Sequence, residues 1–209
     1  MPNSHENNRH GREDNRTGGK ENMDQKRALT ELVGSLAVVY FAINGGAMAT
    51  GLVLAIFMMA MGGTILPMFT LARMASGRDD WEEGALDFLM QLLGGIVAYG
   101  IAWWEMEGDM NAALPGELTV FTGFGALFAG FLMMMVYERK GAGWEVGILA
   151  WMAAVNGATI SGAEDIGEML VTSSWSQEGI IAVFGGMVLA GIGGWLALMF
   201  GEAALGEEE

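Results

Sequence analysis

Beyond residue 28 the chain alternates between long apolar segments and short polar connections. The stretch 32–72 carries no charged residue, and further apolar runs occur at about 84–104, 118–137, 146–163 and 179–201. Roughly 20 apolar residues form one helix that crosses a bilayer, so 32–72 has room for two such helices. Asn44-Gly45-Gly46 is the natural turn between them. The pattern therefore predicts six membrane-spanning helices.

The basic residues predict an orientation. They lie in the N-terminal tail, at Arg73 and Arg78 between spans two and three, and at Arg139 and Lys140 between spans four and five. With six spans these regions lie on one side of the membrane, and the connections on the other side hold no Lys or Arg. The positive-inside rule then places both termini in the cytoplasm. The alternative is a soluble helical bundle, which would not sort its basic residues by topology.

The polar tail and the overall charge narrow the function. Residues 1–28 hold almost no large apolar side chains, so we expect a disordered cytoplasmic tail. A transmembrane domain over 29–201 and an acidic cytoplasmic C-terminus over 202–209 follow it. A net charge of −15 argues against nucleic-acid binding. The chain has no cysteine, and His5 and His10 lie in the tail, so we expect no metal, no cofactor and no enzymatic nucleophile–base pair.

Two halves of the chain resemble each other. Gly94–Trp104 (GGIVAYGIAWW) is echoed by Gly185–Trp195 (GGMVLAGIGGW), and Glu31-Leu32 is echoed by Glu117-Leu118. These echoes divide the domain into repeat one (29–106) and repeat two (115–201), each with three spans. An odd number of spans inverts the second half, which places a functional site near the midplane between the halves.

Each repeat holds a segment too short to cross a bilayer. After span two, Gly62-Gly63 breaks the helix, and Pro67 suits the first position of a new one. After span five, Asp165 is a candidate N-cap with Glu168 three residues later. We expect two short half-helices over about 64–76 and 163–174.

In order and spacing the sequence resembles the aquaporin and glycerol-facilitator family. The resemblance rests on these segments: Thr30-Glu31-Leu32-Val33-Gly34-Ser35, Met90-Gln91-Leu92-Leu93-Gly94-Gly95, Glu117, Pro67 with Thr70-Leu71-Ala72, and Ser161-Gly162-Ala163. It implies an all-α membrane protein with six transmembrane helices and two re-entrant half-helices in an inverted 3+3 repeat. It also implies a homotetramer in the cell membrane.

The family's pore residues are replaced in this chain. The two N-P-A motifs become Leu66-Pro67-Met68 and Ile166-Gly167-Glu168, and the arginine after the second motif becomes Met169. Counting from the motifs places two further selectivity-filter positions at Thr50 and Ala154. The resemblance also assigns support of the re-entrant loops to Glu31, Glu117 and Gln91.

Three functions fit this pattern. The first is a channel in the lipid bilayer that passively transports water or small neutral solutes. The second is a cation-permissive channel that uses Asp165 and Glu168, which would cancel the positive end of the helix dipole. The third is a non-conducting membrane scaffold that keeps the fold.

Overall fold

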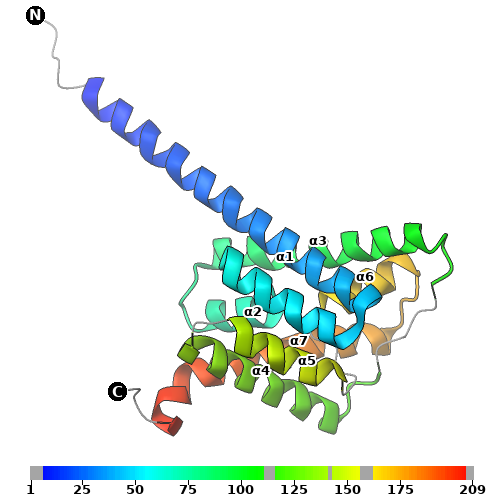
Figure 1. The fold of residues 1–209 in the computed structure, drawn as a ribbon. Helices are drawn as coiled ribbons and strands as arrows, with labels where there is room; N and C mark the ends of the chain where they lie inside the picture. The colour runs from blue at the N-terminus through cyan, green and yellow to red at the C-terminus, as the bar shows by residue number, and fades with distance from the viewer. Residues whose placement is uncertain (1–6, 111–115, 141–142, 156–161, 206–209) are drawn as a thin grey trace, which may run out of the picture.

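The computed structural model describes residues 7–110, 116–140, 143–155 and 162–205, and in these ranges it is all α-helical. Two of the helices are short and lie inside the bundle formed by the longer ones (Figure 1). In chain order the helices are α1 (Asn7–Met61), α2 (Pro67–Ala75), α3 (Trp81–Glu105), α4 (Val120–Lys140), α5 (Gly143–Val155), α6 (Ala163–Val171) and α7 (Gln177–Leu205).

The long helix α1 consists of two arms. Gly46 has φ 68° and ψ −174°, values outside the helical region, and the chain folds back there (Figure 1). A left-handed φ is readily accessible to glycine but costly for other residues. The hydroxyl of Thr50 donates to the carbonyl of Gly46 at 3.0 Å and supports the start of the second arm. The structure therefore has a turn where the sequence predicts one, at Asn44–Gly46.

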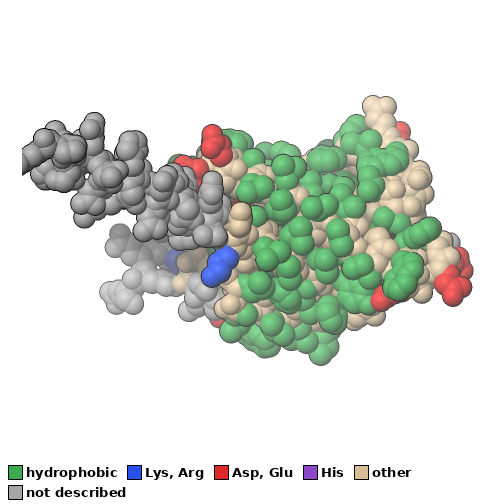
Figure 2. Space-filling model, turned by 90° about the horizontal axis from the view of Figure 1, so that it is seen from above, with side chains coloured by type: hydrophobic (Ala, Val, Ile, Leu, Met, Phe, Trp, Pro, Cys, Tyr) green, Lys and Arg blue, Asp and Glu red, His purple; other side chains and the backbone are tan. Residues whose placement is uncertain are grey.

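Four helices are long and apolar enough to cross a membrane, judged by length and composition. They are Gln25–Met61, Trp81–Glu105, Val120–Arg139 and Gln177–Gly201. Apolar side chains cover most of the face shown in Figure 2, and charged side chains gather toward its ends. This distribution is typical of a multi-pass membrane protein, because side chains that face the hydrocarbon of a bilayer are predominantly apolar. Helix α5 is shorter, and residues 156–161 after it lie outside the described ranges.

The N-terminal segment differs from its prediction. Helix α1 begins at Asn7, so residues 7–28 are helical and not a disordered tail. Glu, Lys and Arg recur in this segment, and all three are good helix formers. The apolar arm that follows supplies a ready helical template, so the polar stretch adds turns without a new nucleus. At the other end α7 continues to Leu205, into the predicted acidic C-terminus.

The helix pairs repeat between the two halves of the chain. Helix α1 packs against α3 in the first half, and α4 packs against α7 in the second. Across the halves α1 packs against α5, where a Cβ on Gly147 would overlap the carbonyl oxygen of Gly51. The short helices lie between these pairs, with α2 against α7 and α3, and α6 against α3. This arrangement brings both short helices to the boundary between the halves.

Candidate functional site

The two short helices have the same length but different starts. Helix α2 begins with Pro67 after an extended Leu66, as predicted. Helix α6 begins at Ala163, after Gly162 in the left-handed conformation at φ 62°. The prediction that Asp165 is the N-cap is therefore wrong. Gly162 turns the chain into the helix three residues earlier, and Asp165 lies within the first turn.

The predicted second motif lies further along its helix than the predicted first motif does. Counted from the beginning of each helix, Leu66-Pro67-Met68 corresponds to Gly162-Ala163-Glu164. The predicted motif Ile166-Gly167-Glu168 lies in the middle of α6 instead. Met169, predicted to take the place of the family's arginine, is the next residue of α6 and is buried. The part that these residues play in a pore stays a prediction.

A buried carboxylate holds the re-entrant loop (residues 62–66) ahead of α2. Glu31 is 2% exposed. Its Oε1 accepts from the backbone N–H of Thr64 at 2.7 Å, and its Oε2 accepts from the N–H of Ile65 at 2.6 Å. These hydrogen bonds satisfy two backbone donors that have no partner in a helix. They also fix the direction in which the chain enters α2.

Gln91 of α3 extends this network. Its Nε2 donates to Glu31 Oε2 at 2.7 Å and to the hydroxyl of Thr70 at 2.8 Å. The hydroxyl of Ser35 donates to the backbone oxygen of Gln91 at 2.7 Å. All these groups are buried, and buried polar groups are tolerated when each finds a partner. The network ties α1, α2 and α3 together around the re-entrant loop.

The re-entrant loop is strained at one residue. Ile65 has φ 61°, which is a genuine outlier for a β-branched side chain. Its hydrogen bond to Glu31 holds the backbone in place, and its side chain is fully buried against Gly34, where a Cβ would lie 2.9 Å from Ile65 Cγ1. Strain of this kind costs on the order of 1–3 kcal/mol and persists where the surroundings fix it.

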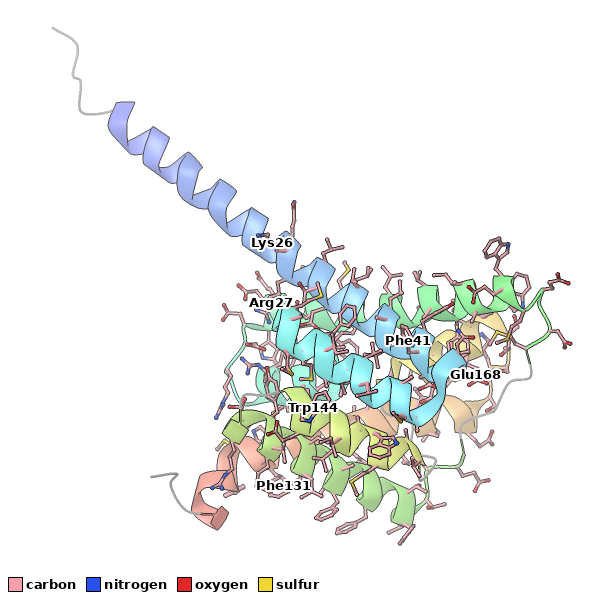
Figure 3. The ribbon with its side chains drawn as sticks, in the orientation of Figure 1. Lys26, Arg27, Phe41, Phe131, Trp144 and Glu168 are labelled. Atoms are coloured by element: carbon pink, nitrogen blue, oxygen red, sulfur yellow. The ribbon has the colours of Figure 1, made fainter. Side chains whose placement is uncertain are left out.

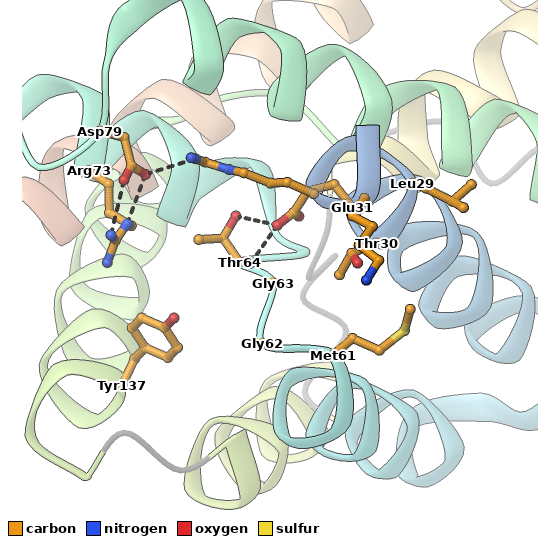
Figure 4. A pocket seen from close by; sticks show the side chains of 12 residues that line it. Leu29, Thr30, Glu31, Met61, Gly62, Gly63, Thr64, Arg73, Asp79 and Tyr137 are labelled. Atoms are coloured by element: carbon orange, nitrogen blue, oxygen red, sulfur yellow. Dashed lines mark hydrogen bonds and ion pairs between the residues drawn. The ribbon is translucent and has the colours of Figure 1, made fainter. Parts of the chain in front are cut away.

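A cavity of about 630 Å³, here called the vestibule, opens beside this loop. Side chains from both halves of the chain line it, as Figure 4 shows. The lining residues are Lys26, Arg27, Leu29, Thr30, Glu31, Met61, Gly62, Gly63, Thr64, Arg73, Asp79 and Tyr137. The vestibule lies at the end of the bundle marked by Lys26 and Arg27, and Glu168 lies toward the other end (Figure 3).

Ion pairs connect the helices at the vestibule. Arg73 Nε donates to Asp79 at 2.9 Å, and Arg27 lies 3.5 Å from the same carboxylate. Burial opposes ionisation of Asp79, but the hydrogen bond and charge of Arg73, with the charge of Arg27, outweigh it and hold the pKa of Asp79 below its ordinary value. Arg27 also pairs with buried Asp87 at 2.5 Å, and Arg73 pairs with Glu138 at 3.4 Å. These pairs join α1, α2, α3 and α4.

After Thr64 the chain continues into fully buried apolar side chains. Ile65, Leu66 and Phe69 are each 0% exposed. The ring of Phe69 stacks on Tyr137, with centroids 5.1 Å apart and an interplanar angle of 22°. These residues begin a contiguous cluster of buried side chains with Leu54, Met134, Val146 and Ala150. Sequence reasoning missed the Phe69–Tyr137 pair, because no local pattern links residues so far apart in the chain.

The remaining predicted pore residues lie apart from the vestibule. Pro67 and Met68 are buried in the first turn of α2, and Gly167 is buried against Gly95 and Tyr99. Thr50 is buried, with its hydroxyl bonded to its own helix. Ala154 is half-buried near the end of α5.

Helix α6 contributes to a buried cluster of its own. Ile166 and Met169 belong to a buried cluster against which Leu71 of α2 packs. The first turn of α6 carries Glu164 and Asp165, and Glu168 follows one turn later. Asp165 and Glu168 are buried, and the hydroxyl of Tyr99 donates to Glu168 at 3.5 Å. The chain has no Lys or Arg after Lys140, so this end of the bundle is acidic.

Glu117, predicted to support the second loop, is exposed ahead of α4. The residues it would have to support include 156–161, which lie outside the described ranges. Its role therefore stays a prediction.

Two short helices packed between paired long helices give the chain an aquaporin-like fold. The chain is similar to the X-ray structure of the aquaglyceroporin from Plasmodium falciparum. The match has a TM-score of 0.70, covers 85% of this chain and 95% of that chain, and has 11% sequence identity. No protein-family model and no curated protein sequence matches the chain. At this identity the likeness shows the fold.

Proposed function

We propose that this chain is a membrane channel of the aquaporin and glycerol-facilitator family that passively conducts water or small neutral solutes. The vestibule is the observation that carries the proposal. It opens at one end of an aquaporin-like fold, between the re-entrant loop of repeat one and Tyr137 of repeat two. A path between inverted repeats begins at such a boundary. The chain is then a channel and not an enzyme.

The proposed topology has six crossings. The two arms of α1 provide two of them, and α3, α4, α5 and α7 provide the others. The basic residues Lys26, Arg27, Arg73 and Arg78 gather at the vestibule end, so we assign this end to the cytoplasm by the positive-inside rule. The family resemblance also leads us to propose a homotetramer.

The apolar core next to the vestibule favours the passage of neutral solutes. Phe69, Leu66 and Leu54 offer no polar atoms, so a bare ion would lose its hydration shell without replacement ligands. A small neutral molecule gives up fewer hydrogen bonds at such an apolar constriction. We therefore expect passage of water or a small uncharged solute in preference to ions.

Flux into vesicles tests the proposal. The purified protein is reconstituted into liposomes, and shrinking and reswelling are followed by light scattering after rapid mixing with sucrose or glycerol. We expect faster water or glycerol movement than in empty liposomes, with a lower activation energy. Water and glycerol movement as slow as in empty liposomes would contradict channel activity of the resting protein.

A cation-permissive channel is the second candidate, and the acidic first turn of α6 favours it. Asp165 and Glu168 are buried in α6, and the family resemblance assigns Met169 to the arginine position, so the fixed charge expected here is negative. A carboxylate there offsets the positive end of the helix dipole and lowers the barrier to a cation. In planar bilayers this candidate predicts a reversal potential set by monovalent cations and abolished by Asp165→Asn. A reversal potential unaffected by a cation gradient would exclude it.

A further inference from the structure

Phe69 connects the vestibule to the buried core. Its ring stacks on Tyr137, which lines the vestibule. Its own side chain is fully buried. The stacked pair therefore links the vestibule wall to the buried core.

The side chains around Phe69 come from both halves of the chain. Leu54 of α1, Met134 of α4 and Val146 of α5 belong to the same buried cluster, and each is fully buried. This cluster therefore spans the boundary between the two repeats. Phe69 is the largest of its fully buried side chains and the one stacked on the vestibule wall.

Ion pairs hold the helix that carries Phe69. Arg73 lies one turn further along α2, so both side chains share one face of the helix. Arg73 pairs with Asp79 and with Glu138, the neighbour of Tyr137 on α4. This face of α2 is therefore fixed to α4 at two successive turns.

From this geometry we infer that Phe69 is the side chain that closes the cytoplasmic half of the path and sets the rate and size limit of conduction. The inference rests on the proposed function. Passage requires the ring to leave its stack on Tyr137, and a smaller side chain removes the obstruction. Phe69→Ala then opens the path, whereas Phe69→Leu fills much of the same space and leaves it nearly closed.

The test compares osmotic water flux and glycerol flux in liposomes that hold equal amounts of wild-type protein, Phe69→Ala and Phe69→Leu. We expect a several-fold rise for Phe69→Ala and little change for Phe69→Leu. Phe128→Ala is the matched control, because Phe128 is an exposed phenylalanine on α4. Retention of trapped sucrose excludes general leakage. If Phe69→Ala does not fold, Tyr137→Ala removes the other ring of the stack and is expected to raise flux as well.

The outcomes separate the two proposals. Flux above that of empty liposomes in wild type, with no further rise in either ring-removal variant, would overturn the role of Phe69 and leave the channel function standing. Flux at the level of empty liposomes in wild type, Phe69→Ala and Tyr137→Ala would overturn the channel function and, with it, the role of Phe69 as the side chain that closes the path. A silent wild type with a conducting Phe69→Ala variant would support the plug in a closed resting channel.

Discussion

Glu31→Gln is the substitution whose effect the structure defines best. The carboxylate accepts on both oxygens: Oε1 from the N–H and hydroxyl of Thr64, and Oε2 from the N–H of Ile65 and from Nε2 of Gln91. The glutamine amide has one oxygen, and its nitrogen only donates. Whichever way the amide is turned, one backbone N–H, that of Thr64 or that of Ile65, loses its acceptor, whereas Gln91 and the Thr64 hydroxyl keep partners among Thr64 and Thr70.

The expected loss follows from the burial of these groups. A buried donor left without an acceptor costs about 1–3 kcal/mol, so we expect a loss of this size in the free energy of unfolding. The strained backbone of Ile65 also loses the bond that holds it, so the re-entrant loop is expected to become mobile.

The assay is reversible unfolding in mixed micelles by titration with a denaturing detergent, followed by tryptophan fluorescence. Glu82→Gln is the control, because Glu82 is an exposed carboxylate on α3 and its change is expected to leave the midpoint within error. Glu31→Gln as stable as wild type would refute the view that this carboxylate holds the loop.

Two further predictions concern the vestibule end and the helix contacts. The pKa of Asp79 is lower in the folded state than its ordinary value of 3.8, so its ion pairs contribute stability above that value and lose it as pH falls through the folded pKa. Unfolding titrations from pH 6 to pH 3 should show this loss in wild type and a smaller one in Asp79→Asn; equal losses would contradict the assignment. Gly147→Val should lower stability by about 1–3 kcal/mol, because the side chain would force α1 and α5 apart. Gly100→Val, where a Cβ has nothing within 4 Å, is its control in the same unfolding assay, and equal effects of the two would argue against the close approach.

Local features of the fold were predictable because their causes are local. Asn44-Gly45-Gly46 predicts a turn, and Gly46 has the positive φ that such a turn requires. Gly62-Gly63 followed by Pro67 predicts a helix break and a new start, and α2 begins at Pro67. In both places the backbone restriction of one or two residues decides the structure.

The errors arose where two local signals competed. Asp165 is a good N-cap by residue type, but Gly162 takes the left-handed conformation first, and α6 starts there. The polar residues 7–28 have too few apolar side chains to fold alone, but they continue a helix that the apolar arm of α1 has already formed. Residue type by itself does not show which signal prevails.

The contacts of the vestibule could not be predicted from local sequence. Phe69 and Tyr137 meet only because α2 and α4 pack against each other, and Arg27 reaches Asp79 and Asp87 across the interface of α1 and α3. Such pairs depend on the tertiary arrangement, which a resemblance to a fold gives only in outline.

Blocking the vestibule is the most direct measurement of the central claim that it is the entrance to a conducting path. The chain has no cysteine, so Thr30→Cys gives a single thiol in the vestibule lining, and Leu89→Cys gives one on the exposed apolar face of α3. Water flux is measured in liposomes before and after reaction with a bulky, membrane-permeant thiol reagent. We expect the reagent to abolish the protein-dependent flux of Thr30→Cys and to leave that of Leu89→Cys unchanged. Full flux through Thr30→Cys after complete labelling would contradict the account.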